Sequence, residues 1–335
     1  MRPSSLILPL SLALGLLAAG VFAPSARAAD ELEAAEAALD RLEGVMKKRK
    51  TINETLIAGL DEVMEYYNQL QPPVKPEPLP IPDEATDEEK KEIEKQNDDA
   101  LDDWEDAVKK WDREVGKFKK DVRDALIDAF KLVKPSRQTH INEREDVNIK
   151  AVELIATMSG ENEEIREDMS DDLIKAMEGV LFKAKDYDPT ELLYEKAFAA
   201  LGALNDMDAL EWIIEEFTHT RSSPQKEVMK LSAAHKAMVL FKNVPGKTRY
   251  ELVDEMIKNY AGVESQAEQS SADPKVQEKK RFWDRIKMDV IAAVQYYAAE
   301  PRDAEGQVIA RMDGFQDWFR DNDNARRAPW TDPDE

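Results

Sequence analysis

Gly246, Lys247 and Thr248 are the first residues whose types and spacing point to a chemistry, the binding of a nucleotide phosphate. A phosphate-binding loop of this kind needs a further glycine upstream and a preceding β-strand, because its backbone amides must approach the phosphates closely. Phe241 stands at the position of that glycine, and no strand pattern precedes it. The sequence therefore predicts no phosphate-binding loop here.

The three histidines, His140, His219 and His235, are the residues most suited to bind zinc. They show no paired ligand spacing, and the chain has no cysteine that could join them. We interpret them as ordinary helix or loop residues.

The segment Asp321-Asn322-Asp323-Asn324 begins like a calcium-binding loop. The sixth position of that loop needs a glycine for its sharp turn, and Arg326 occupies it. The twelfth position holds Asp332, whose side chain is shorter than the usual glutamate. The pattern does not indicate a dedicated calcium site.

Carboxylate pairs carry no information in this chain, because 70 acidic residues place many of them near one another. No Gly-x-Ser-x-Gly nucleophile motif or His-Glu-x-x-His metalloprotease motif is present. The sequence thus predicts no catalytic, cofactor-binding or metal-binding residues and no cofactor. An all-helical hydrolase, whose acids converge only in three dimensions, is kept as the least favoured alternative.

The charge of the whole chain narrows the class of partner. Its 335 residues include 70 Asp and Glu against 47 Lys and Arg, which gives a net charge of −23. This charge repels phosphate backbones and anionic lipids, so we expect no nucleic-acid binding and no direct binding to anionic membranes. The absence of cysteine excludes disulfides, lipid attachment at an N-terminal cysteine and thiol catalysis.

The N-terminal residues 1–28 have the pattern of a signal peptide. Arg2 precedes an apolar stretch from Leu6 to Phe22, and Ala26-Arg27-Ala28 is a small-x-small cleavage site. We predict export and cleavage before Ala29, with an uncleaved membrane anchor as the alternative. A large cysteine-free exported chain favours a bacterial protein that is periplasmic or extracellular.

Residues 29–70 are predicted to form a first long helix. Polar Arg49 and Asn53 interrupt its apolar heptad positions beside the basic run 47–50, so a kink near residue 50 is an alternative to a straight helix. The apolar positions are Leu32, Ala35, Leu39, Leu42, Met46, Leu56, Leu60, Val63, Tyr67 and Leu70.

Residues 71–83 form a proline-rich connector that cannot be helical, because each proline lacks an amide donor and restricts its predecessor. We interpret it as a stiff, polyproline-like spacer. The alternative is a docking ligand for an aromatic groove.

Residues 84–134 carry the most regular heptad pattern of the chain and predict a second long helix. Two such helices joined by a short connector favour an antiparallel coiled-coil hairpin, with Trp104 and Trp111 in its core. The alternatives are an aromatic surface that grips a ligand, or pairing with a second copy to give a homo-oligomer. The apolar positions are Leu101, Trp104, Val108, Trp111, Val115, Phe118, Val122, Ala125, Ala129 and Leu132.

Residues 141–335 show shorter apolar segments separated by Gly, Pro, Asn or Asp, which is typical of paired short helices. The stretch 196–214, with its Ala-Leu-Gly-x-Leu core, Asp turn and Ala-Leu restart, resembles a HEAT-type repeat. Weaker copies of its first helix begin near Ala151, Ala234 and Val290, at irregular spacing. The usual Val-Arg pair and Asp/Arg ladder are absent. Expected second helices are 163–185, 209–217, 250–260 and 315–320, with a polar surface insertion at 262–280.

The sequence predicts an all-α fold, in which a long antiparallel helical hairpin precedes an α-solenoid of HEAT-like helix pairs. The HEAT resemblance implies a binding scaffold and no reaction. The expected function is an exported noncatalytic scaffold or adaptor that binds a protein partner of unknown identity. The leading alternative is a self-assembling coiled-coil structural protein of the cell envelope.

Overall fold

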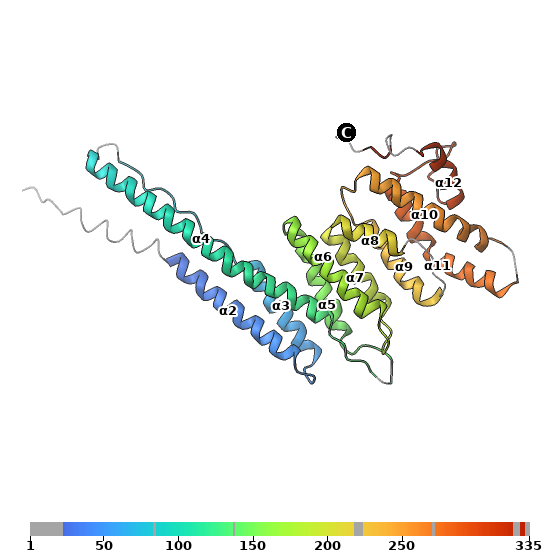
Figure 1. Ribbon diagram of the computed structural model, residues 1–335, viewed down its shortest axis with the longest axis horizontal. Coiled ribbons are helices and arrows are strands. Elements are labelled where there is room, and N and C mark those ends of the chain that lie inside the picture. The colour runs from blue at the N-terminus through green and yellow to red at the C-terminus, as the bar shows by residue number, and fades with distance from the viewer. Residues whose placement is uncertain are drawn as a thin grey trace, which may run out of the picture. The chain divides into compact units, whose positions relative to one another are not determined.

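A computed structural model describes residues 23–82, 85–136, 138–217, 224–269, 272–323 and 329–331, with the backbone alone for 23–29 and 224–226. These residues form helices and two isolated β-bridges but no strand, so the predicted all-α class is confirmed. They divide into two compact units, 1–125 and 126–335, shown in Figure 1. None of the described helices combines the length and apolarity needed to cross a bilayer.

The predicted signal peptide lies mostly outside the described residues, because the described chain begins at Ala23. The predicted cleavage site falls within the first turns of α2 (Ala23–Met46), of which only the backbone is described. Export and processing therefore stay predictions from the sequence.

The predicted helix 29–70 is two helices, α2 and α3 (Asn53–Gln69). The break lies at the basic run, where polar residues interrupt the apolar heptads and the Thr51 hydroxyl donates a hydrogen bond to the Val45 carbonyl (2.8 Å). The two helices pack antiparallel in Figure 1. Arg41 pairs with Glu62 at 2.7 Å, and a Cβ at Gly59 would lie 3.1 Å from Leu42 Cδ1.

Helix α4 (Asp87–Phe130) begins with a capping box. The Thr86 amide donates to Glu89 Oε2 (2.8 Å), and the Glu89 amide donates to Thr86 Oγ1 (3.3 Å). The heptad positions of α4 from Val115 onward are buried, as at Val115 and Phe118. The earlier ones, including Trp104 and Trp111, are only half-buried.

The proline-rich connector explains this difference, because it lies along α4 as a single extended segment. The Trp104 indole N–H donates to the Pro73 carbonyl (3.0 Å), and the Leu79 amide donates to Asn97 Oδ1 (2.7 Å). Nearer the C-terminal half of α4, the Lys119 ammonium lies 4.6 Å from the Tyr67 ring centroid. The chain from 67 to 79 thus runs antiparallel to α4. One extended segment covers less surface than a helix, which leaves the first half of the heptad seam partly exposed.

The second unit contains the last turn of α4 and eight further α-helices within the described chain. Their bounds are α5 (Glu145–Ala156), α6 (Glu163–Met177), α7 (Glu191–Leu204), α8 (Met207–Phe217), α9 (Pro224–Met238), α10 (Gly246–Ala267), α11 (Pro274–Tyr297) and α12 (Met312–Asp321).

These helices pack in two series. Helix α5 packs against α7, α7 against α9, and α9 against α11. The alternate helices form the other series, in which α6 contacts α8, α8 contacts α10, and α10 contacts α12 (Figure 1). The arrangement is compatible with a helical-repeat fold.

Small side chains allow the helices of the first series to approach closely. A Cβ on Gly202 of α7 would lie 2.8 Å from Leu240 Cβ and 3.1 Å from the Ala237 carbonyl, at the end of α9. Ala197 and Ala200 of α7 and Ala234 of α9 are fully buried. The alanine-rich pattern of the sequence therefore marks helix-packing positions.

Residues 262–280 were expected to be a polar surface loop. This prediction is wrong, because most of these residues are helical. Helix α10 continues to Ala267, and α11 begins at Pro274, after Asp273 Oδ1 accepts a hydrogen bond from the Lys275 amide (2.8 Å). The Glu264 side chain is buried and caps α12. The polar composition of residues 262–267 is therefore compatible with a helix, in which the Glu264 side chain points inward and the other polar side chains point outward.

Candidate functional site

The phosphate-loop residues form a packing contact. Gly246 is the first residue of α10, and a Cβ there would overlap the Trp330 carbonyl oxygen. Trp330 itself is 1% exposed and meets the ring of Tyr250 edge-on, with centroids 5.5 Å apart. The glycine is required by this close approach of the C-terminal segment to α10.

The three histidines are not brought together as a zinc site. His140 is an exposed loop residue with a φ of 54°, His235 is fully buried in α9, and His219 lies outside the described residues. The carbonyl of His140 accepts a hydrogen bond from the Asp188 amide (2.7 Å), which gives its loop a structural role.

The calcium-like segment is only partly described, since Asn324, Arg326 and Asp332 lie outside the described residues. The carboxylate of Asp323 accepts a hydrogen bond from the Tyr250 hydroxyl, and the Asn322 carbonyl accepts one from the Trp330 indole (2.9 Å). Within the described chain, no three His, Asp or Glu side chains are grouped to hold a metal ion.

Two carboxylates of the second unit are buried, and each caps a helix. Asp206 accepts hydrogen bonds from the first amides of α8, and Glu264 accepts them from the Met312 amide (2.8 Å) and the Asp313 amide (3.4 Å) of α12. Burial raises the pKa of both carboxyl groups. Their hydrogen bonds assign these acids to helix termini.

His235 should make the protein less stable in acid. Burial lowers its pKa to about 4, while its Nδ1 lies 2.5 Å from the Leu231 carbonyl oxygen. Between pH 6.5 and 4 the unfolded chain takes up a proton there and the folded chain does not, so stability falls as pH falls. At about 1.4 kcal/mol per pKa unit, this contribution amounts to roughly 3 kcal/mol.

His235→Leu removes that contribution. Urea unfolding at a series of pH values should show the stability of the parent declining more steeply than that of His235→Leu below pH 6.5. Parallel curves would show that His235 is protonated in the folded protein at the same pH as in the unfolded chain.

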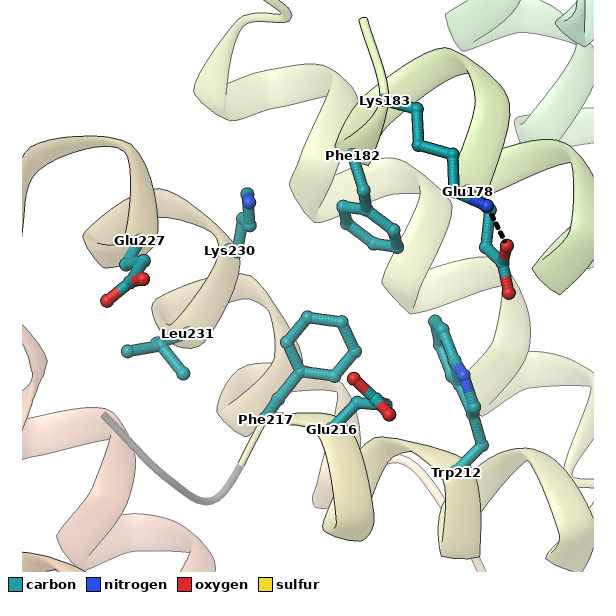
Figure 2. A pocket seen from close by; sticks show the side chains of 9 residues that line it. All are labelled: Glu178, Phe182, Lys183, Trp212, Glu216, Phe217, Glu227, Lys230 and Leu231. Carbon is teal, nitrogen blue, oxygen red and sulfur yellow. Dashed lines mark hydrogen bonds and ion pairs between the residues drawn. The ribbon is translucent and has the colours of Figure 1, made fainter. Parts of the chain in front are cut away.

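A pocket of about 370 Å³ in the described structure is lined by aromatic and charged side chains from α8, α9 and the turn that follows α6. Figure 2 shows the rings of Phe182, Trp212 and Phe217 around its open space, with Lys230 and Glu227 on the side formed by α9. We call it the aromatic pocket.

The rings of the aromatic pocket lie close to one another. The Phe217 centroid lies 5.5 Å from that of Phe182 and 5.2 Å from that of Trp212. Phe198 of α7 meets Phe217 edge-on at 5.0 Å. These separations are typical of favourable aromatic pairs.

A π-helix, η3 (Glu178–Phe182), places two side chains at this pocket. The sequence predicted a single helix over 163–185, but α6 ends at Met177 and the wider turn follows. The Tyr187 hydroxyl donates to the Val180 carbonyl (2.5 Å), and the Tyr194 hydroxyl donates to the Leu181 carbonyl (3.0 Å), so the turn is held from outside. Such turns occur frequently at functional sites.

The charges of the pocket are unequal. Glu178 pairs with Lys183 at 2.5 Å, and the Lys230 ammonium lies 5.5 Å from the Phe182 centroid. Glu216 and Glu227 have no ion pair within the described part of the chain. The described lining carries three carboxylates and two ammonium groups, so the pocket combines aromatic faces with a net charge of −1.

A second pocket, of about 260 Å³ between α10 and α11, has a balanced set of charges. Arg311 pairs with Glu268 at 2.6 Å, and Lys287 pairs with Asp284 at 3.0 Å. Its charges compensate one another and leave no preference for a charged ligand.

The sequence did not predict the aromatic pocket. Trp212 lies in the HEAT-like stretch 196–214, but Phe182 and Lys230 come from other helices and share no spacing with it. The only signal was the density of aromatic residues around 182–217.

No family model matches the chain, and neither the curated proteins nor the solved structures contain a significant match to it.

Proposed function

We propose that this protein is an exported, noncatalytic scaffold that binds another protein through a HEAT-like array of helix pairs. The observation that carries the proposal is the order of helix packing, in which α5, α7, α9 and α11 form one series and α6, α8, α10 and α12 form the other. Helix pairs that stack in this way present long surfaces suited to proteins.

Two further observations support protein binding. Large apolar side chains on the first series are exposed, including Leu192 of α7 (48% exposed) and Met288 of α11 (67%). The buried acids cap helices, which argues against a pair of catalytic carboxylates as in the all-helical hydrolase.

Photo-crosslinking tests the scaffold proposal. A photoreactive phenylalanine placed at Leu192, and separately at Met288, should crosslink the full chain to the same protein in the exported fraction of the source organism. The control position is Lys91, which is exposed on α4 in the other unit. Adducts at neither Leu192 nor Met288 would contradict binding through this series.

Self-assembly is the second candidate, and α4 favours it. Leu101, Trp104, Val108 and Trp111 continue the heptad seam but are only half-buried, and the buried Trp111 indole N–H has no acceptor in the described structure. A second copy could cover this seam. Under the scaffold proposal, light scattering should give the mass of one chain at every concentration tested. A mass that rises to a multiple would favour self-assembly.

A further inference from the structure

We infer that the aromatic pocket binds the guanidinium group of an arginine side chain on the partner protein. The inference rests on the proposed function of protein binding and names the chemistry that one contact would recognise. It is carried by the ring geometry, the charge balance and the depth of the pocket.

Ring faces supply the first part of the argument. Aromatic faces attract cations within about 6 Å of the ring centroid. The Lys230 ammonium already lies 5.5 Å from the Phe182 centroid, so one ring face of this pocket accommodates a positive charge. Trp212, the ring type that attracts cations most strongly, faces the same space in Figure 2.

The charge balance is the second part. Glu216 lies at the end of α8 beside Phe217, and Glu227 lies in the first turn of α9. Neither has an ion pair among the described residues, whereas Glu178 is held by Lys183. The C-terminal end of α8 adds partial negative charge and the N-terminal end of α9 adds partial positive charge, so the two helix ends offset each other. Lys230 offsets one carboxylate, and the remaining net charge of −1 favours a cationic ligand over an anionic one.

Arginine fits these features better than a compact cation. Its planar guanidinium can stack on a ring and donate two parallel hydrogen bonds to one carboxylate. Phe217 is only 8% exposed, while the Lys183 side chain is 71% exposed. A long side chain on a peptide suits a pocket whose innermost ring is this well covered.

Titration of the full chain with a defined peptide tests the inference. The probe is acetyl-Gly-Ser-Arg-Ser-Gly-amide, followed by the indole N–H signal that Trp212→Phe removes from the ¹⁵N–¹H spectrum. The signal should shift in a saturable way. The same peptide with citrulline, which keeps the shape and loses the charge, should bind about tenfold more weakly.

Two variants locate the contact. The double substitution Glu216→Gln, Glu227→Gln should weaken the arginine peptide about tenfold, and Lys230→Met should tighten it several-fold by removing a competing cation. The control is Glu215→Gln, an exposed neighbour of Glu216 that does not line the pocket and should change nothing.

Two results would overturn the inference: equal binding of the arginine and citrulline peptides, or equal effects of Glu215→Gln and the double substitution. The crosslinking experiment reports separately. A crosslinked partner together with no peptide binding would refute the arginine contact and leave the scaffold proposal intact. Peptide binding with no crosslinked partner would refute the scaffold proposal and leave guanidinium binding by the pocket intact.

Discussion

Replacing Ala200 by glutamate should destabilise the second unit by more than about 4 kcal/mol, because an unpaired charge would be buried among packed helices. Ala200 is 0% exposed on α7, which packs against α5 on one side and α9 on the other. A glutamate side chain has no room there without separating the helices. Thermal and urea unfolding of the purified variant would measure the loss.

The matched control is Ala199→Glu, one position earlier on the same helix, where the side chain is only half-buried. This variant changes charge and helix propensity in the same way. Because its side chain can reach solvent, it should cost far less stability. If Ala200→Glu unfolds at the same urea concentration as the parent, the packing of α7 between α5 and α9 is wrong.

Asn148→Asp should cause a comparable loss with almost no change in shape. Asn148 is fully buried, and its Nδ2 donates to the carbonyls of Phe130 (2.7 Å), Leu132 (3.0 Å) and Ala129 (3.1 Å) at the end of α4. A carboxylate cannot donate, and it would place negative charge against three carbonyl oxygens. We expect a loss of about 4 kcal/mol at neutral pH.

The pH dependence of this variant identifies the cause. Facing carbonyl oxygens would raise the pKa of the introduced aspartate in the folded state, so the deficit should be full at neutral pH and shrink as protonation restores one donor. Asn162→Asp is the control, because Asn162 caps α6 through its Oδ1 (3.0 Å from the Ile165 amide) and aspartate caps equally well. A deficit that does not change with pH would contradict this explanation.

The all-α class and most helix positions could be predicted, because apolar spacing is a local property of the chain. The stretch 196–214 is an example, since its Asp turn falls between α7 and α8 and the Asp206 side chain caps α8. The π-turn of η3 could not be predicted, because the hydroxyls of Tyr187 and Tyr194 that hold it belong to a later segment. The aromatic pocket needs three helices to meet and has no signature along the chain.

The direction of side chains within polar stretches could not be predicted either. Residues 262–267 contain one inward carboxylate, Glu264, that ties α10 to α12, and composition alone does not show its direction. Similarly, the heptads of residues 84–134 placed Trp104 in a helical core. Its partner is the extended backbone at Pro73, which contributes a hydrogen bond and partial cover in place of a helix face.

The extended proline-rich connector along α4 bears on the tendency of the chain to aggregate. An unpaired extended segment usually offers a row of amides and carbonyls to which other chains can add as strands. Between residues 72 and 82 six positions are proline, so more than half of those donors do not exist, and the Leu79 amide and carbonyl are both engaged by Asn97. This segment can therefore lie open on a helix without becoming a template for intermolecular sheet formation.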